Sequence, residues 1–226
     1  MALLLFDIDG TLLYTDGSGR DAASQSFKKY FHIKDAFKNV HLMGRTDQAI
    51  WKEVCKMNHI FPEDYEKVKN RLLEDYYAFL KRNLIRRKKG YIYPGIKEIL
   101  QKVHSHHALG LLTGNFKHGA MIKLAHFDLD KFFPVGGFAD DDEDRNNIAR
   151  IAITRAKQHY ALDFQNKDIY IIGDTPFDIK CALSTQTKSV AVATGGYSFE
   201  DLKKHKPDYL FHSFKEIDSF LKIIKK

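Results

Sequence analysis

The sequence is poor in the residue types that mark several specialised protein classes. Among its 226 residues only Cys55 and Cys181 are cysteines, and no CxxC pair occurs. We therefore expect neither a disulfide framework nor a zinc ribbon, and a reducing, cytoplasmic location is the natural expectation. No basic segment and no long apolar stretch accompanies the first strand, so the sequence predicts no signal peptide and no membrane span.

Several nucleotide-binding and hydrolytic motifs are also missing. The chain contains no GxxxxGK[ST] sequence and no GxSxG elbow, so neither a P-loop nor a serine-hydrolase site is indicated. Residues 17–22 match a relaxed GxGxxA pattern, but they follow the first predicted strand by ten residues. A dinucleotide-binding turn needs its glycines directly after the strand, so this match carries no weight.

Positive charge exceeds negative charge, with 36 Lys and Arg against 29 Asp and Glu. The densest basic segment spans residues 81–89. A solvated helix end explains such a cluster, since cations are favoured at helix C-termini. A positive field also attracts phosphorylated substrates, and it leaves a nucleic-acid-binding protein as an alternative, although no nucleic-acid-binding motif accompanies the patch.

The most informative segment is the start of the chain. Residues 2–6 are all apolar, which is typical of a strand buried on both faces of a parallel sheet. Asp7 and Asp9 follow directly, and Gly10 allows a sharp turn. Two acids beside a buried strand are costly unless a cation holds them, and Mg²⁺ is the obvious candidate.

The order of predicted elements indicates an α/β fold, a doubly wound parallel sheet with an all-helical insert. The insert lies between the first and second strands of the sheet. It divides the chain into a core domain of residues 1–14 and 91–226 and a helical cap domain of residues 15–90. The predicted strands cover residues 2–6, 108–112, 132–138, 168–172, 189–193 and 209–211, and helices fill most of the intervals.

Three of these strands end in polar residues that meet at one edge of the sheet. Residues 7–12 (DIDGTL), 112–115 (LTGN) and 173–178 (GDTPFD) stand at these ends. In this order they resemble the first, second and fourth motifs of the haloacid dehalogenase (HAD) superfamily, and the resemblance extends over the whole chain. The position of the cap is similar to that in phosphoglycolate phosphatase-like members.

The resemblance implies a Mg²⁺-dependent phosphatase that hydrolyses a small phosphomonoester through an aspartyl-phosphate. Asp7 would be the nucleophile, and Asp9 would protonate the leaving oxygen and then activate water. Mg²⁺ would be held by Asp7, the main-chain carbonyl of Asp9, and Asp174, with Asp178 acting through water.

The phosphoryl group would be bound by the second motif and by a cation. Thr113 would donate its hydroxyl, and its neighbours Gly114 and Asn115 would donate main-chain N–H groups. The family usually supplies a lysine as its third motif; here Arg145 is the best-placed cation, and Arg150 is the alternative.

One loop of the cap is a further candidate for substrate binding. Residues 44–47 (GRTD) lie between two predicted helices, and Arg45 could contact the non-reacting end of the substrate. The alternative is a plain helix-entry loop in which Thr46 caps the following helix.

Two other functions remain open. A phosphomutase could return the phosphoryl group from the same aspartyl-phosphate to a sugar. A non-enzymatic nucleic-acid-binding protein could retain the fold, although such a protein has no need of both Asp7 and Asp9. The expected partner is a small phosphorylated metabolite, with nucleic acid less favoured and no membrane partner, while the oligomeric state stays open.

Overall fold

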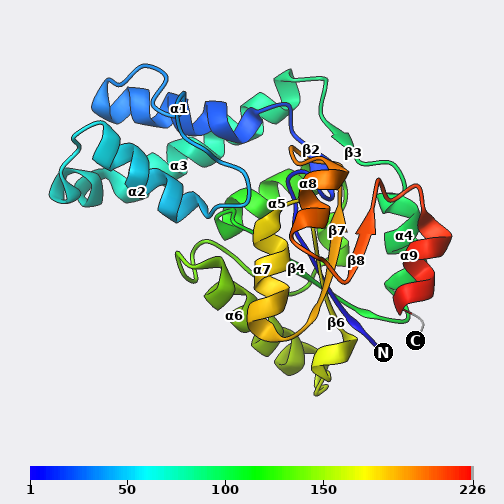
Figure 1. The fold of residues 1–226 in the computed structure, drawn as a ribbon. Helices are drawn as coiled ribbons and strands as arrows, with labels where there is room; N and C mark the ends of the chain where they lie inside the picture. The colour runs from blue at the N-terminus through cyan, green and yellow to red at the C-terminus, as the bar shows by residue number, and fades with distance from the viewer. Residues whose placement is uncertain (225–226) are drawn as a thin grey trace.

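The computed structural model describes residues 1–224, which form a twisted sheet between helices and a group of three helices beside it (Figure 1). The strands are β1 (Leu3–Phe6), β2 (Leu13–Tyr14), β3 (Tyr91–Ile92), β4 (Ala108–Leu112), β5 (Gly136–Gly137), β6 (Ile169–Gly173), β7 (Lys188–Val192) and β8 (Tyr209–Phe211). The helices are α1 (Ser18–Phe31), α2 (Asp47–Met57), α3 (Pro62–Arg86), α4 (Ile96–Val103), α5 (Lys117–His126), α6 (Arg145–Tyr160), α7 (Pro176–Thr185), α8 (Phe199–Lys204) and α9 (Ile217–Ile224), with short 3₁₀ turns at Asp130–Phe132 and Asn166–Asp168.

The main sheet confirms the doubly wound parallel fold. Its strand order is β5-β4-β1-β6-β7-β8, and every neighbouring pair is parallel. Leu4 in the central strand pairs with Leu109 on one side and with Tyr170 on the other. The chain winds outward in opposite directions from β1, so the carboxyl ends of β1, β4 and β6 lie side by side where the winding reverses. This is where ligands bind in open α/β sheets.

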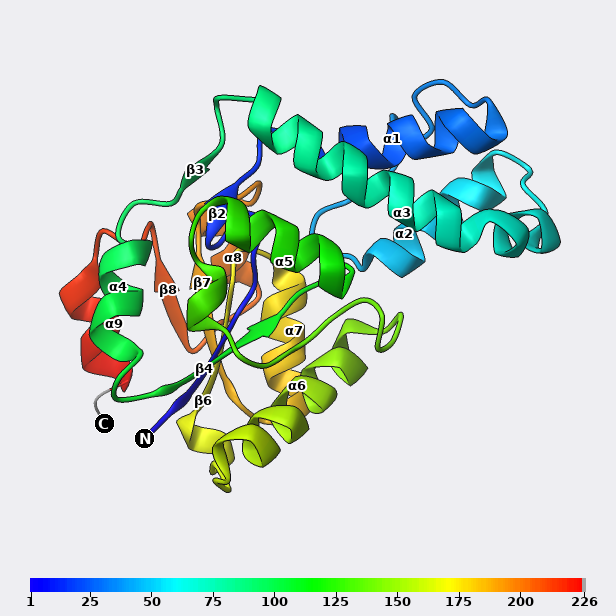
Figure 2. The same cartoon turned by 180° about the vertical axis from the view of Figure 1, so that it is seen from behind.

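Helices cover both faces of the sheet (Figures 1 and 2). Leu3 and Leu5 pack in a cluster with residues of α6 and α7, whereas Leu4 and Phe6 pack with residues of α4, α5 and α9. Because successive side chains of a strand point to opposite faces, a strand between two helical layers must be apolar throughout. This explains the unbroken apolar run of β1.

Helices α1, α2 and α3 form their own cluster around Trp51, whose ring meets those of Phe27 and Tyr76 edge to face with centroids 5.4 Å apart in each case. The chain enters this group after β2 and leaves it before β3, and these two strands pair antiparallel. Arg87 joins the segment that leaves the helical group to the segment that enters it, because it donates to the main-chain oxygen of Asp16 and forms an ion pair with Asp21.

Most predicted elements agree with the structure to within a few residues, but two features differ. The strand expected over residues 132–138 is wrong in extent, because only Gly136 and Gly137 pair with β4. A 3₁₀ turn ends at Phe132 and Pro134 lies just before the pairing residues, so little of the segment is free to form a ladder. The β2–β3 ribbon was not expected. Within residues 1–224 no helix has the length and apolar composition needed to cross a membrane.

Candidate active site

Parallel strands bring residues from distant parts of the sequence to one edge. Asp7 follows β1, Thr113 follows β4 and Asp174 follows β6. All three side chains are buried. The register that places Phe6 opposite Leu111 and Ile172 sets the ends of these strands at one level. The sheet therefore positions the site.

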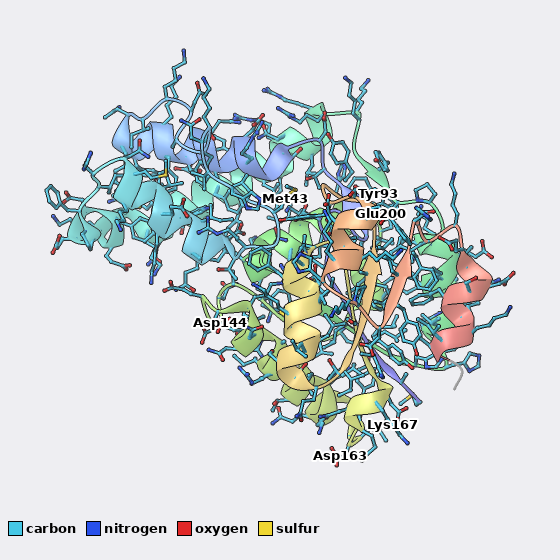
Figure 3. The ribbon with its side chains drawn as sticks, in the orientation of Figure 1. Met43, Tyr93, Asp144, Asp163, Lys167 and Glu200 are labelled. Carbon is cyan, nitrogen blue, oxygen red and sulfur yellow. The ribbon has the colours of Figure 1, made fainter. Side chains whose placement is uncertain are left out.

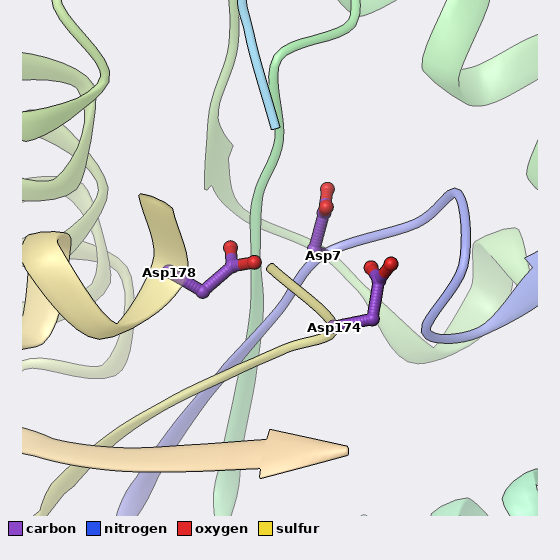
Figure 4. A group of neighbouring side chains, drawn as sticks. All are labelled: Asp7, Asp174 and Asp178. Atoms are coloured by element: carbon purple, nitrogen blue, oxygen red, sulfur yellow. The ribbon is translucent and has the colours of Figure 1, made fainter. Parts of the chain in front are cut away.

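Three buried carboxylates converge at this edge (Figure 4). One oxygen from each of Asp7, Asp174 and Asp178 lies within 4.8 Å of the others. Burial raises the pKa of Asp7 to about 6, although the nearby guanidinium of Arg145 opposes the rise. Burial also raises the pKa of Asp174 well above its ordinary value, and the charges of Asp7 and Asp178 add to the effect. The cluster is therefore short of positive charge.

Arg145 begins α6 and supplies the cation within this cluster. Its Nη2 lies 2.5 Å from Asp178 Oδ1 and 3.1 Å from Asp7 Oδ2. Although burial by itself lowers the pKa of Arg145, the carboxylates of Asp178 and Asp7 hold it above its ordinary value. Its Nε–H is buried and has no acceptor among the described residues. Arg150, the alternative cation, is exposed and bonds Asn147.

The fourth-motif segment is held by the start of α7. Asp178 Oδ2 accepts hydrogen bonds from the main-chain N–H and the hydroxyl of Thr175, at 3.0 and 2.7 Å. This reciprocal capping box fixes the first turn of the helix. Both oxygens of Asp178 thus already accept hydrogen bonds, one from Thr175 and one from Arg145.

The residues around Asp174 fit a divalent cation. Thr11 Oγ1 donates to Asp174 Oδ1 at 3.0 Å and orients the carboxylate. A Cβ at Gly10 or at Gly195 would overlap this carboxylate, and Gly10 has a φ of 85° that favours glycine. The glycines leave open space around an oxygen-donor cluster with one guanidinium for three acids, which suits a hard cation such as Mg²⁺.

The second motif lies against Asp9. Asn115 Nδ2 donates to Thr113 Oγ1 at 2.8 Å and to Asp9 Oδ2 at 2.9 Å. Thr113 accepts this bond, so its own hydroxyl proton is free to be donated. Gly114 and Asn115 line the cavity described below. Asp9 itself stays outside the carboxylate cluster, and its side chain is 42% exposed.

A buried lysine that the sequence did not single out completes this group. Lys123 in α5 is only 4% exposed, and its Nζ lies 2.6 Å from both Asp9 Oδ2 and Asn115 Oδ1. One signal was available in the sequence. Lys123 stands three residues after Ala120 and one before Leu124, on the apolar stripe of its helix, where a cation needs a partner.

A cavity of about 500 Å³ opens over these groups, between the sheet edge and the α1–α3 helices. Asp7, Asp9 and Asp174 line it from the sheet edge, and Trp51 and Tyr76 of α2 and α3, with Phe37 of the loop between α1 and α2, line it from the helical group. Met43 and Tyr93, which also line it, lie where the helical group meets the sheet domain (Figure 3). The cavity therefore has a charged floor and a largely aromatic and aliphatic roof.

The loop before α2 contacts the core directly. Asp47 N donates to the carbonyl of Gly114 at 2.7 Å, and Asp47 Oδ2 accepts from the main-chain N–H of Phe116 at 2.9 Å. Arg145 donates to the carbonyl of Gly44 at 3.3 Å. Arg45 lines the cavity, but its guanidinium lies 2.5 Å from Glu53. Thr46 also caps α2, as the alternative interpretation of this loop required.

Comparisons with known proteins agree with this geometry. A family model described as haloacid dehalogenase-like hydrolase matches residues 4–192. Pyrophosphatase PpaX of Halalkalibacterium halodurans is 26% identical, over 95% of this chain and 94% of that protein. Two solved structures share the fold, each over 98% of both chains. They are a predicted phosphoglycolate phosphatase from Haemophilus somnus, with a TM-score of 0.74 and 19% identity, and a predicted phosphatase from Clostridium acetobutylicum, with 0.71 and 22%.

Proposed function

The chain belongs to the haloacid dehalogenase-like hydrolase family, and on that premise we propose that it is a Mg²⁺-dependent phosphatase acting on a small phosphomonoester. The observation that carries the proposal is the convergence of Asp7, Asp174 and Asp178 on one buried point beneath the cavity. A nucleophilic carboxylate and a set of oxygen ligands are what phosphoryl transfer through an aspartyl-phosphate requires.

The reaction divides into two displacements at phosphorus. In the first, a carboxylate oxygen of Asp7 attacks, the bond to the leaving oxygen breaks, and Asp9 gives that oxygen a proton. In the second, Asp9 takes a proton from water, whose oxygen attacks the aspartyl-phosphate and returns the Asp7 carboxylate and inorganic phosphate. Asp9 is two residues from the nucleophile and faces the same cavity, so one carboxyl serves both steps.

The remaining groups of the site bind the phosphoryl oxygens. Thr113 offers its free hydroxyl proton, and Gly114 offers its main-chain N–H close to the start of α5. The main-chain N–H of Asn115 already donates to Thr113 Oγ1 at 3.3 Å, so Asn115 would first have to exchange this bond for one to the phosphate. Arg145 holds Asp7 in place, and its Nε–H, which has no acceptor within residues 1–224, is a further donor for an anionic oxygen.

The chemistry of the donors assigns the metal ligands. Asp7, Asp174 and the main-chain carbonyl of Asp9 are the proposed direct ligands, and Asp178 acts through water because Thr175 and Arg145 already occupy its oxygens. When bound, Mg²⁺ reduces the repulsion between an anionic nucleophile and an anionic phosphate.

Residues 15–90 act, in this proposal, as a cap over a core of residues 1–14 and 91–226. The cap roofs the cavity with Phe37, Trp51 and Tyr76, which excludes water from the reacting phosphate and limits the substrate to a small phosphorylated metabolite. The relatives named as a pyrophosphatase and as a phosphoglycolate phosphatase agree with a small anionic substrate. Arg45, freed from Glu53, is the candidate contact for the non-reacting end.

Hydrolysis of p-nitrophenyl phosphate tests the proposal. Wild type and Asp7→Asn should be compared, each with Mg²⁺ and with EDTA. We expect turnover only in wild type with Mg²⁺, and a loss of at least about 10³-fold in the variant because the nucleophile is gone. Turnover that persists without the metal or without Asp7 would contradict it. Absence of turnover together with a trappable acyl-phosphate would instead indicate a phosphomutase.

A further inference from the structure

Lys123 is buried in an unusual place for a lysine. It lies on the inner face of α5, where Gly19 of α1 approaches it, and its Nζ makes two hydrogen bonds. A buried ammonium is costly unless it is paired and hydrogen-bonded. Asp9 and Asn115 accept the hydrogen bonds of the Lys123 ammonium. The negative charge of Asp47 lies close enough to interact with Lys123 as well.

The pairing holds one particular oxygen of Asp9. Lys123 Nζ and Asn115 Nδ2 both donate to Asp9 Oδ2, at 2.6 and 2.9 Å. Lys123 Nζ also holds Asn115 Oδ1, so the three side chains form a closed triangle. Because Oδ2 accepts both of these hydrogen bonds, Oδ1 is the oxygen of Asp9 that remains available to a substrate.

Asp9 needs such a restraint more than its neighbours do. Its side chain is 42% exposed, whereas Asp7 and Asp174 are held in the buried floor of the site. An exposed carboxyl rotates among several rotamers, and each rotation moves its oxygens by more than the tolerance of a proton transfer. The triangle removes that freedom.

We propose that Lys123 is the positioning residue for the acid–base carboxyl, holding Asp9 so that Oδ1 meets the leaving oxygen. The inference rests on the proposed phosphatase function and adds a residue to it. Its consequence concerns leaving groups. A basic alkoxide must be protonated as it departs and depends on a correctly held Asp9, whereas a weakly basic nitrophenolate departs without a proton.

Two substrates of nearly equal size separate these cases. Phosphate release from p-nitrobenzyl phosphate, with an alkoxide leaving group, should be compared with release from p-nitrophenyl phosphate. Lys123→Met should lower kcat/KM for the benzyl ester by about 10- to 100-fold, part of the ~10²–10⁴ that a positioned acid contributes. It should leave kcat/KM for the nitrophenyl ester nearly unchanged, because kcat/KM reports the transfer to Asp7 and not the later attack of water, in which Asp9 serves both substrates alike. Lys123→Arg, which keeps a cation and its donors, should recover part of the loss.

Two further variants sharpen the test. Lys117→Met, at the exposed start of the same helix, should leave both rates unchanged. In an Asp9→Asn background, Lys123→Met should cause no further loss on the benzyl ester, because the two changes remove the same function. If Lys123→Met fails to fold, Lys123→Gln, with no charge and one amide donor group, replaces it in the same comparison.

Several outcomes would overturn the inference. Equal losses of kcat/KM on both esters would show that Lys123 only supports the structure, and no loss on either would show that Asp9 needs no restraint. A further loss of activity on adding Lys123→Met to Asp9→Asn would also overturn the inference, because Lys123 would then act independently of Asp9. A wild type that hydrolyses only the nitrophenyl ester would count against a held acid. A wild type that hydrolyses neither ester would instead refute the proposed phosphatase.

Discussion

Asp47 shows how one partly buried acid can tie stability to pH. It is the first residue of α2, and its carboxylate accepts a hydrogen bond from the main-chain N–H of Phe116. Burial raises its pKa to about 6, although the positive charge of Lys123 opposes the rise. The folded state therefore holds this proton more tightly than the unfolded state. The stability contributed by the group is complete below about pH 4 and is lost as the pH rises through 6.

Asp47→Asn should for this reason stabilise the protein at neutral pH. The amide oxygen can keep the hydrogen bond from Phe116 without a partly buried charge. We expect the free energy of unfolding at pH 7.5 in EDTA to rise by up to about 3 kcal/mol, and the gain to vanish near pH 4. Urea unfolding at the two pH values measures this. Glu63→Gln, in the exposed first turn of α3, is the control. An equal gain at both pH values would refute the explanation.

The acids of the sheet edge could be found from the sequence, whereas two of their neighbours could not. Asp7 and Asp174 follow unmistakable buried strands, so their position at one edge follows from parallel topology alone. Lys123 and Asp47 become neighbours of Asp9 only through packing between helices. A single lysine on an apolar stripe indicates a buried partner without saying which one. Arg145 was preferred to Arg150 from its place at the start of the predicted helix, and in the structure Arg145 contacts Asp7 and Asp178 while Arg150 is exposed.

At the scale of elements, the loop before α2 rests directly on the end of β4. A Cβ at Gly114 would run into the carbonyl of Arg45 and come within 3.2 Å of Thr46 Cα. The same contact carries the hydrogen bond from Asp47 N to Gly114 O. Glycine at this position therefore sets how closely the helical group approaches the sheet.

Gly114→Ala should push this loop away from the core without unfolding the sheet. We expect a loss of about 1–3 kcal/mol from overpacking and faster hydrogen exchange at the amides of Asp47 and Phe116, with protection kept in β4. Gly119→Ala is the control, because its Cβ would lie 3.4 Å from Tyr76 and alanine favours a helix. Unchanged exchange at Asp47 in Gly114→Ala would show that the contact does not hold the loop.

Element prediction succeeded where the local pattern was strong. The limits of β4 agree with the strand expected over residues 108–112, because its run is apolar and buried on both faces. The segment 132–138 was predicted as a strand because it is rich in aromatic residues. In the structure these residues pack against the core from turns and a loop, so tertiary contacts and not local propensity decide the conformation. The β2–β3 ribbon could not be predicted because each strand has only two residues, and the two strands are separated in sequence by the whole helical insert.

At the scale of the whole molecule, the carboxylate cluster should make stability depend on the metal. Mg²⁺ at about 100 times its Kd should add about 2.7 kcal/mol to the folded state, and raise the Tm by roughly 5–10 °C. Asp174→Asn should lose this shift, because it removes a proposed ligand. Thermal unfolding with and without Mg²⁺ provides the measurement.

The matched control is Asp163→Asn, whose carboxylate is exposed and lies at the other end of the sheet domain from Met43 and Tyr93, two residues that line the cavity (Figure 3). It should keep the full Mg²⁺ shift. A shift that survives in Asp174→Asn would place the metal elsewhere and contradict the ligand set.

The central position of β1 also has a consequence for folding during synthesis on the ribosome. Leu4 cannot pair until Leu109 and then Tyr170 have been synthesised, whereas α1 can pack against α3 once residue 86 has emerged. At translation rates of about 5–20 residues per second, the earliest strand stays without its second neighbour for on the order of 10 s. An apolar strand left open for that long is a natural client for a chaperone, and the helical insert is the first part of this protein able to become compact.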